Sequence, residues 1–130
     1  MSERQARVWL ALRWACVFGW MALIFALSAQ SSFPLPRVLW DDLYDIAGHL
    51  GVYAVLAGLL RWALAGARVR RPGLWAFVLA VLYGISDEFH QSFVPGRHPD
   101  IFDVATDAVG AWAGLRLLRP RNGRVSGDPD

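Results

Sequence analysis

Residues 14–36, WACVFGWMALIFALSAQSSFPLP, contain no charged side chain and form a run long enough to cross a lipid bilayer. A helix needs about 20 apolar residues to cross the ~30 Å hydrocarbon layer. Further uncharged runs occupy residues 46–60 and 72–86. Of the 130 residues, 55% are hydrophobic and only 18% are charged, whereas about 25% are charged in an average soluble domain. The sequence therefore predicts an integral membrane protein.

The composition argues against other classes of protein. Low charge together with abundant Trp, Phe and Leu excludes a disordered chain. The single cysteine, Cys16, excludes an internal disulfide framework. The net charge is only +2 and the arginines lie beside apolar segments, so nucleic acid is not an expected partner.

The length of the chain is accounted for by four membrane-spanning helices. The expected spans are residues 8–28, 43–65, 73–91 and 102–118. Four crossings use about 80 residues and leave the rest for loops and a tail. The predicted fold class is therefore all-α, a bundle of four transmembrane helices.

The charged residues predict the orientation of this bundle. The chain has 13 arginines and no lysine, and most of the arginines flank alternate spans. Basic loops stay in the cytoplasm, so both termini are expected there, with the acidic loops outside the bacterial inner membrane. Residues 1–118 would form the transmembrane domain, and residues 119–130 a polar cytoplasmic tail. The arginines assigned to the cytoplasmic side are Arg4, Arg7, Arg13, Arg61, Arg68, Arg70, Arg71, Arg116, Arg119, Arg121 and Arg124.

A cleaved signal peptide is the alternative interpretation of the first span. The segment has a basic start, an apolar stretch at residues 14–27, and the small residues Ala26 and Ser28 around a potential cleavage point. The later spans would keep the same orientation in either case.

Polar side chains lie near the expected external ends of the later spans. In the second span, Asp45, His49 and Tyr53 recur every four residues and so follow one side of the helix. Asp45 would lie one turn from His49, where it would orient the imidazole ring or favour its protonated form. The alternative is an ordinary wet helix end with a hydrogen-bonded histidine and an interfacial tyrosine.

The third span places a carboxylate and an amide beside small residues. Ala80, Gly84, Asp87 and Gln91 share one helix face. Small residues let helices approach closely in a membrane. This face is therefore expected to point into the bundle.

A turn at Pro95 and Gly96 follows the third span. It would bring Arg97 back over Asp87 and Glu88 as an internal counter-charge. The alternative is a simple connector, with both acids solvated at the membrane surface.

The fourth span carries acids and glycines on one face. Asp103 and Asp107 are followed on that face by Gly110 and Gly114, a G-x-x-x-G packing strip. By itself the strip indicates helix packing. Together with the acids it predicts carboxylates held against neighbouring helices, with Asp107 one turn deeper than Asp103.

Acids outnumber bases at the expected external edge, which constrains its chemistry. Two carboxylates ~4 Å apart repel by about 4 kcal/mol at an effective dielectric constant of about 20. A divalent cation, shared protons or a cationic ligand group would compensate them. No established catalytic or phosphate-binding motif is present to require an enzyme. The candidate metal ligands are His49, Glu88, Asp103 and Asp107, and the candidate catalytic groups are His49, Asp87, Glu88 and Asp107.

At these residues the chain resembles the VanZ-like family of small bacterial membrane proteins, whose name comes from a teicoplanin-resistance protein. The resemblance covers residues 28–114. Ile46 stands where the family commonly has lysine, and Asp107 stands where it commonly has asparagine, which adds a negative charge at the predicted site. The residues that carry the resemblance are Asp45, His49, Tyr53, Ser86, Asp87, Glu88, Gln91, Phe93, Pro95, Gly96, Arg97, Asp103, Gly110 and Gly114.

The resemblance implies a membrane protein that is linked, in some members, to reduced susceptibility to glycopeptides with a lipid tail. Together with the residues above, it predicts an external polar site that binds or modifies a cell-envelope component. The expected partners are the lipid bilayer, a lipid-linked envelope molecule or an amphiphilic glycopeptide, and a second copy of the chain through a glycine face. The alternatives are a proton- or ion-coupled transporter and a structural assembly factor without catalysis. The expected ligand-binding residues are Asp45, His49, Tyr53, Asp87, Glu88, Gln91, Arg97, Asp103 and Asp107.

Overall fold

The computed structural model describes residues 1–30 and 41–118, except for the side chains of residues 41–45. This described part contains four helices and no strand, which confirms the predicted all-α class. Each helix lies within a few residues of an expected span. The predicted tail at residues 119–130 lies outside the described residues. The helices are α1 (Glu3–Ser28), α2 (Asp41–Gly66), α3 (Pro72–Gln91) and α4 (Ile101–Leu117).

Local sequence explains where α1, α3 and α4 begin. α1 begins earlier than the expected span because Ser2 and Gln5 form a capping box. The backbone N–H of Gln5 donates to Oγ of Ser2 (3.3 Å), and the backbone N–H of Ser2 donates to Oε1 of Gln5 (2.8 Å). α3 has Pro72 in its first turn, where a backbone N–H would have no helical partner. α4 follows Asp100, whose Oδ1 accepts from the backbone N–H of Phe102 (2.9 Å).

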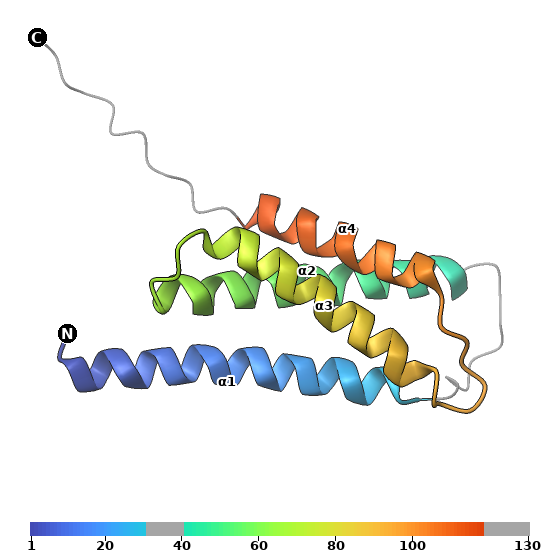
Figure 1. Ribbon diagram of the computed structural model, residues 1–130, viewed down its shortest axis with the longest axis horizontal. Helices are drawn as coiled ribbons and strands as arrows, with labels where there is room; N and C mark the ends of the chain where they lie inside the picture. Colours follow the sequence, from blue (N-terminus) through green and yellow to red (C-terminus); the bar gives the residue numbers. More distant parts are fainter. Residues whose placement is uncertain (31–40, 119–130) are drawn as a thin grey trace, which may run out of the picture.

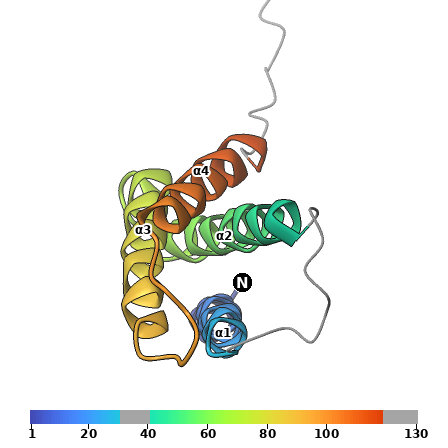
Figure 2. The same ribbon diagram turned by 90° about the vertical axis from the view of Figure 1, so that its right-hand side faces the viewer.

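Successive helices run in opposite directions, and α2 is the central one. In Figure 1 the N-terminus, the α2–α3 connection and the end of α4 lie at one end of the molecule, while the α3–α4 connection lies at the other. α2 contacts every other helix, most extensively α4. Figure 2 shows α1 and α4 on opposite sides of α2. The polar residues at the end of α3 and the start of α4 are thereby brought to the same end of the bundle as the end of α1.

Two glycines of α4 allow the close contact between α4 and α2. A Cβ atom on Gly110 would lie 2.5 Å from the carbonyl oxygen of Leu50, and one on Gly114 would overlap the carbonyl oxygen of Ala54. Any side chain at these positions would therefore meet backbone of α2. The predicted packing strip is confirmed, and its partner is a helix of the same chain. Association with a second copy of the chain stays a prediction.

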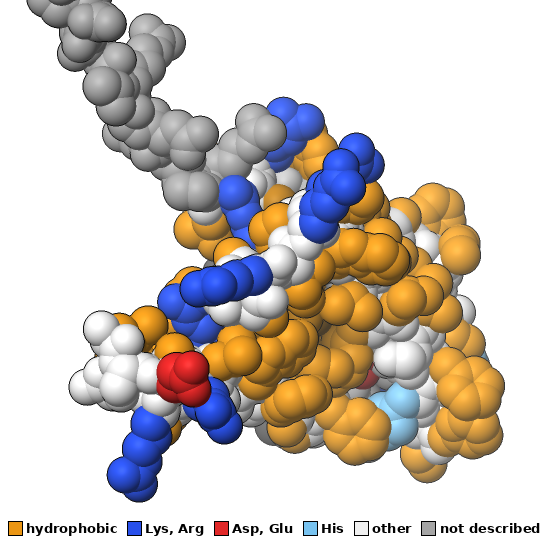
Figure 3. Space-filling view, turned by 60° about the vertical axis from the view of Figure 1, so that its left-hand side comes forward, with side chains coloured by type: hydrophobic (Ala, Val, Ile, Leu, Met, Phe, Trp, Pro, Cys, Tyr) orange, Lys and Arg blue, Asp and Glu red, His pale blue; other side chains and the backbone are white. Residues whose placement is uncertain are grey.

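The outer surface of the bundle is largely apolar. Large side chains such as Phe18, Trp75 and Trp112 are at least half exposed, and Figure 3 shows a broad hydrophobic surface with arginines gathered to one side. Within the described residues, two helical segments are long and apolar enough to cross a membrane, Glu3–Ser28 and Ile46–Gly66. The expectation of four crossings goes beyond this finding and stays a prediction.

Candidate functional site

A buried carboxylate joins α1 to α3 at the end of the bundle away from the N-terminus. Oδ1 of Asp87 accepts a hydrogen bond from Oγ of Ser28 (2.6 Å), and its Oδ2 accepts one from Nε2 of Gln91 (3.1 Å). All three side chains are buried. Ala80 and Gly84 are buried on the same face of α3, as predicted. Both oxygens of Asp87 thus have donors within the chain, which compensates for burying the charge.

Arg97 reaches this cluster through an amide. Gly96 adopts a left-handed backbone with φ of 82°, and the turn that it forms directs Arg97 back over α3. Nη2 of Arg97 donates to Oε1 of Gln91 (3.0 Å), whose Nε2 contacts Asp87. The turn thus brings Arg97 back to the end of α3, while its predicted role as a counter-charge to Asp87 and Glu88 stays a prediction. Its described partner, however, is the Gln91 side chain, which lies between the guanidinium group and Asp87.

A second polar pair joins α2 to α4. Nδ1 of His49 lies 2.8 Å from Oδ1 of Asp107, and Asp107 is 1% exposed. Asp107 fits against α3 because Gly84 has no side chain, since a Cβ there would lie 3.0 Å from Oδ2 of Asp107. When Nδ1 donates to the carboxylate, Nε2 is the acceptor atom of the neutral ring. The predicted partner of His49 on its own helix, Asp45, has its side chain outside the described residues.

Tyr53 lies deeper in α2 and is buried, contrary to the alternative interpretation of an interfacial tyrosine. It is 1% exposed, and its hydroxyl has no hydrogen-bond partner among the described residues. Its ring lies 6.4 Å from that of Tyr83, centroid to centroid. A buried hydroxyl without a partner loses its contacts with water and gains nothing in return. It is therefore the kind of group that a ligand or a bound water would satisfy.

The remaining predicted site residues serve the junction between α3 and α4. Oε2 of Glu88 accepts a hydrogen bond from the backbone N–H of Asp100 (2.9 Å), which ties the end of α3 to the start of α4. Asp103 is half-buried in the first turn of α4. Among the residues that the structure describes, no group of three or more His, Cys, Asp and Glu side chains is placed to hold a metal ion. The predicted metal ligands His49, Glu88, Asp103 and Asp107 are thus not assembled into one cluster.

A cavity of about 260 Å³ opens beside Asp87 and His49. α1, α2, α3 and the loop after α3 all contribute to its lining, which combines polar and apolar side chains. Glu88, Asp103 and Asp107 do not line it, although Asp107 contacts His49, which does. Ser28 does line it, although the sequence analysis did not include this residue among the candidate site residues. The polar lining residues are Ser28, His49, Tyr53, Asp87, Gln91 and Arg97, and the apolar ones include Ile24, Leu27 and Val52.

Comparison with known families gives a match to one family model. The VanZ/LLP1 model matches residues 13–120, which include most of α1 and all of α2, α3 and α4. The chain belongs to the VanZ/LLP1 family. This confirms the resemblance drawn from the sequence. Neither the curated proteins nor the solved structures gave a match to this VanZ/LLP1 member.

The matched region holds every polar residue that lines the cavity. The VanZ/LLP1 member therefore builds its site from residues that are far apart in the sequence, since Ser28 and Asp87 lie 59 positions apart and His49 and Asp107 lie 58 apart. Membership of this family, together with the two long apolar helices, indicates a membrane protein.

Proposed function

We propose that this VanZ/LLP1 member is an inner-membrane protein that crosses the bilayer four times and binds the polar part of a cell-envelope amphiphile. The ligand would be a lipid-linked cell-wall molecule or a glycopeptide with a lipid tail. The observation that carries the proposal is the cavity in which Ser28, Asp87 and Arg97 meet apolar side chains of α1 and α2. Binding pockets for small molecules combine apolar walls with a few fixed polar groups in this way.

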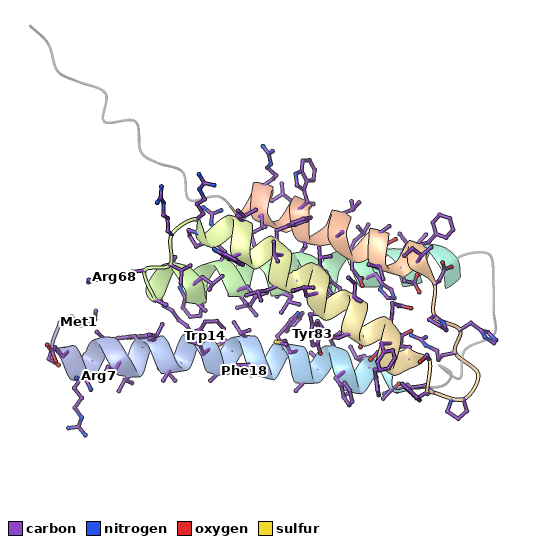
Figure 4. The ribbon with its side chains drawn as sticks, in the orientation of Figure 1. Met1, Arg7, Trp14, Phe18, Arg68 and Tyr83 are labelled. Atoms are coloured by element: carbon purple, nitrogen blue, oxygen red, sulfur yellow. The ribbon has the colours of Figure 1, made fainter. Side chains whose placement is uncertain are left out.

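The charge distribution supports an orientation with both termini in the cytoplasm. Figure 4 shows Met1, Arg7 and Arg68 at one end of the molecule. Arg70, Arg71 and Arg116 belong to connections and helix ends at that same end. The cavity and the acids of α3 and α4 lie at the opposite end, which holds few arginines and which the positive-inside rule would therefore place outside. Residues 1–118 would form this domain, with residues 119–130 as a cytoplasmic tail.

The buried residues favour binding over transport of protons or ions. A transported ion needs polar groups along its path through the membrane. Toward the arginine-rich end, the core residues of α2 are apolar: Leu56, Ala57, Leu60, Ala63 and Leu64. A polar site closed on one side by apolar packing suits a bound headgroup. Catalysis by His49, Asp87, Glu88 or Asp107 stays a hypothesis, because binding requires no bond to break.

We predict that cysteine labelling in spheroplasts will place the α3–α4 connection outside the membrane and the α2–α3 connection inside. Cys16 is exposed and is first replaced by alanine, after which Arg68→Cys and His98→Cys are made separately. Both positions are exposed. Arg68 lies in the α2–α3 connection and His98 in the α3–α4 connection, and these connections lie at opposite ends of the bundle. A maleimide that cannot cross membranes should label His98→Cys in intact spheroplasts and Arg68→Cys only after lysis. Labelling of Arg68→Cys alone in intact spheroplasts would show that the orientation is inverted.

A matched pair of glycine variants tests the cavity itself. Gly48 lines the cavity and Gly51 does not, yet a Cβ atom would meet nothing within 4 Å at either position. Gly48→Phe should therefore fill the cavity without disturbing the fold, while Gly51→Phe adds the same side chain elsewhere on α2. The probes are a lipid-tailed glycopeptide and a polyprenyl-linked cell-wall precursor, titrated against purified protein. We expect binding of at least one probe to weaken more than about tenfold in Gly48→Phe, a change of about 1.4 kcal/mol.

The control variant decides how the result is interpreted. Gly51→Phe should bind the probe as the unmodified protein does. Equal affinity of both variants, or no binding of either probe to the unmodified protein, would contradict the proposal that the cavity takes an envelope amphiphile.

A further inference from the structure

A second cavity of about 160 Å³ lies between α1, α2 and α3, and its lining is almost wholly apolar. Trp14 and Met21 border it from α1, Leu56 and Leu60 from α2, and Leu79 and Tyr83 from α3. Figure 4 shows Trp14 and Tyr83 in the seam between α1 and the rest of the bundle. This cavity contains no group that would require a polar ligand, and so it suits a hydrocarbon chain.

The two cavities follow the same face of each helix. On α3 the face that carries Leu79 and Tyr83 in the apolar cavity continues, one turn at a time, to Asp87 and Gln91 in the polar cavity. α1 continues in the same way from Met21 to Ser28, and α2 from Leu56 to Tyr53 and His49. The cavities therefore lie one after the other along a single seam, with the apolar one nearer the arginine-rich end.

Tyr83 lines the apolar cavity one helical turn from Asp87, which lines the polar cavity. Its hydroxyl donates to the backbone carbonyl oxygen of Met21 (2.6 Å), so its polar atom is directed to α1 while its ring borders the apolar cavity. The neighbouring ring of Tyr53 borders the polar cavity. Aromatic side chains with one polar atom are suited to such a boundary between polar and apolar surroundings.

Two buried groups that border the polar cavity can donate hydrogen bonds and lack partners. The hydroxyl of Tyr53 and Nε of Arg97 are both buried, and neither has a hydrogen-bond partner among the described residues. Asp87, by contrast, accepts at both oxygens. Nε of Arg97 can only donate, and a phenol hydroxyl donates readily. A group that supplies acceptors would satisfy both of them, and an oxyanion forms the strongest hydrogen bonds with an arginine.

We propose that the seam binds an amphiphile with one hydrocarbon chain and a phosphate monoester as its headgroup. The phosphate oxygens accept from Tyr53 and Arg97, and the chain passes Tyr83 into the apolar cavity beside Trp14. A phosphate offers terminal oxygens in several directions, which suits donors that approach from α2 and from the loop after α3. This inference rests on the proposed function, since it names the class of ligand that the same cavity would take.

Tryptophan fluorescence tests the inference directly. The purified protein in maltoside micelles is titrated with dodecyl phosphate that carries bromine on its chain, because bromine quenches nearby indole rings. We expect saturable quenching that is largely lost in Trp14→Phe and retained in Trp75→Phe, since Trp75 is exposed and does not line the seam. Tyr53→Phe should weaken binding roughly fivefold to tenfold, as expected for one lost hydrogen bond, and Arg97→Gln by more than about tenfold.

Comparison of probes separates this inference from the proposed function. Brominated dodecyl maltoside has the same chain without a charge, and inorganic phosphate has the charge without a chain. Saturable quenching by the maltoside that survives Tyr53→Phe would overturn the phosphate headgroup, and dodecyl phosphate binding no more tightly than inorganic phosphate would overturn the chain site. In both cases Gly48→Phe could still block a glycopeptide or precursor, and the proposed function would stand. Failure of all probes would overturn both.

Discussion

Replacement of Gly114 by alanine is expected to destabilise the protein by more than about 2 kcal/mol, because a single added methyl group meets backbone. Alanine would otherwise stabilise a helix by about 1 kcal/mol relative to glycine. A decrease in the free energy of unfolding would therefore indicate a clash, and an increase would indicate helix propensity alone. The added Cβ would overlap the carbonyl oxygen and approach the Cα of Ala54, and backbone cannot move aside as a flexible side chain can. The measurement is thermal unfolding of the purified protein, followed by circular dichroism.

Gly51→Ala provides the matched control for this prediction. Gly51 lies on α2 and is exposed, and a Cβ atom added there would have no other atom within 4 Å. The variant should unfold at the same or a slightly higher temperature than the unmodified protein, in line with helix propensity alone. If Gly114→Ala behaved in the same way, α4 would not be packed on α2 as closely as its glycine contacts indicate.

Replacement of Asp107 by leucine is expected to cost about 2 kcal/mol or more, because it removes the buried carboxylate that contacts Nδ1 of the partly buried His49. Asp107 is 1% exposed and its Oδ1 lies 2.8 Å from Nδ1 of His49. Asp107→Asn should cost less than about 1 kcal/mol, since an amide oxygen can still accept from Nδ1. The same unfolding measurement compares the two variants.

A double-mutant cycle isolates the pair from general packing effects. In a His49→Leu background the donor is gone, so Asp107→Leu should cost at least about 1 kcal/mol less than it does alone. An identical cost in both backgrounds would mean that the two side chains do not interact, and that the loss comes from packing against Gly84.

The sequence was sufficient to predict the features that depend on local spacing. Apolar runs predicted the helices to within a few residues, and helical periodicity predicted the buried face of α3 with Asp87 and Gln91. The glycine strip of α4 was found in the same way, because Gly110 and Gly114 recur at helical spacing. The early start of α1 was missed because a capping box, and not hydropathy, sets it.

Features that depend on distances between helices could not be predicted in this way. Spacing on α2 suggested Asp45 as a partner of His49, and this stays a prediction because the Asp45 side chain lies outside the described residues. The same spacing could not indicate Asp107 of α4, whose Oδ1 lies 2.8 Å from Nδ1 of His49. Ser28 was overlooked because nothing near it in the sequence indicates Asp87. The candidate metal ligands lie at the same end of the bundle, but this does not determine where their side chains point. Glu88, for example, accepts a hydrogen bond from the backbone of Asp100.

The attachment of α1 has a consequence for the order in which the chain enters a bilayer. Trp20, Met21 and Ser28 of α1 form hydrogen bonds outside the helix. Their partners are Val52, Tyr83 and Asp87 respectively, and the ribosome adds all three partners to the chain after α1. In the proposed arrangement α1 must insert alone, and only 11% of its apolar window is covered by the rest of the chain even after folding. Its own hydropathy would therefore have to suffice for insertion, whereas α4, in the same proposed arrangement, would pack against α2 when α2 is already in the bilayer.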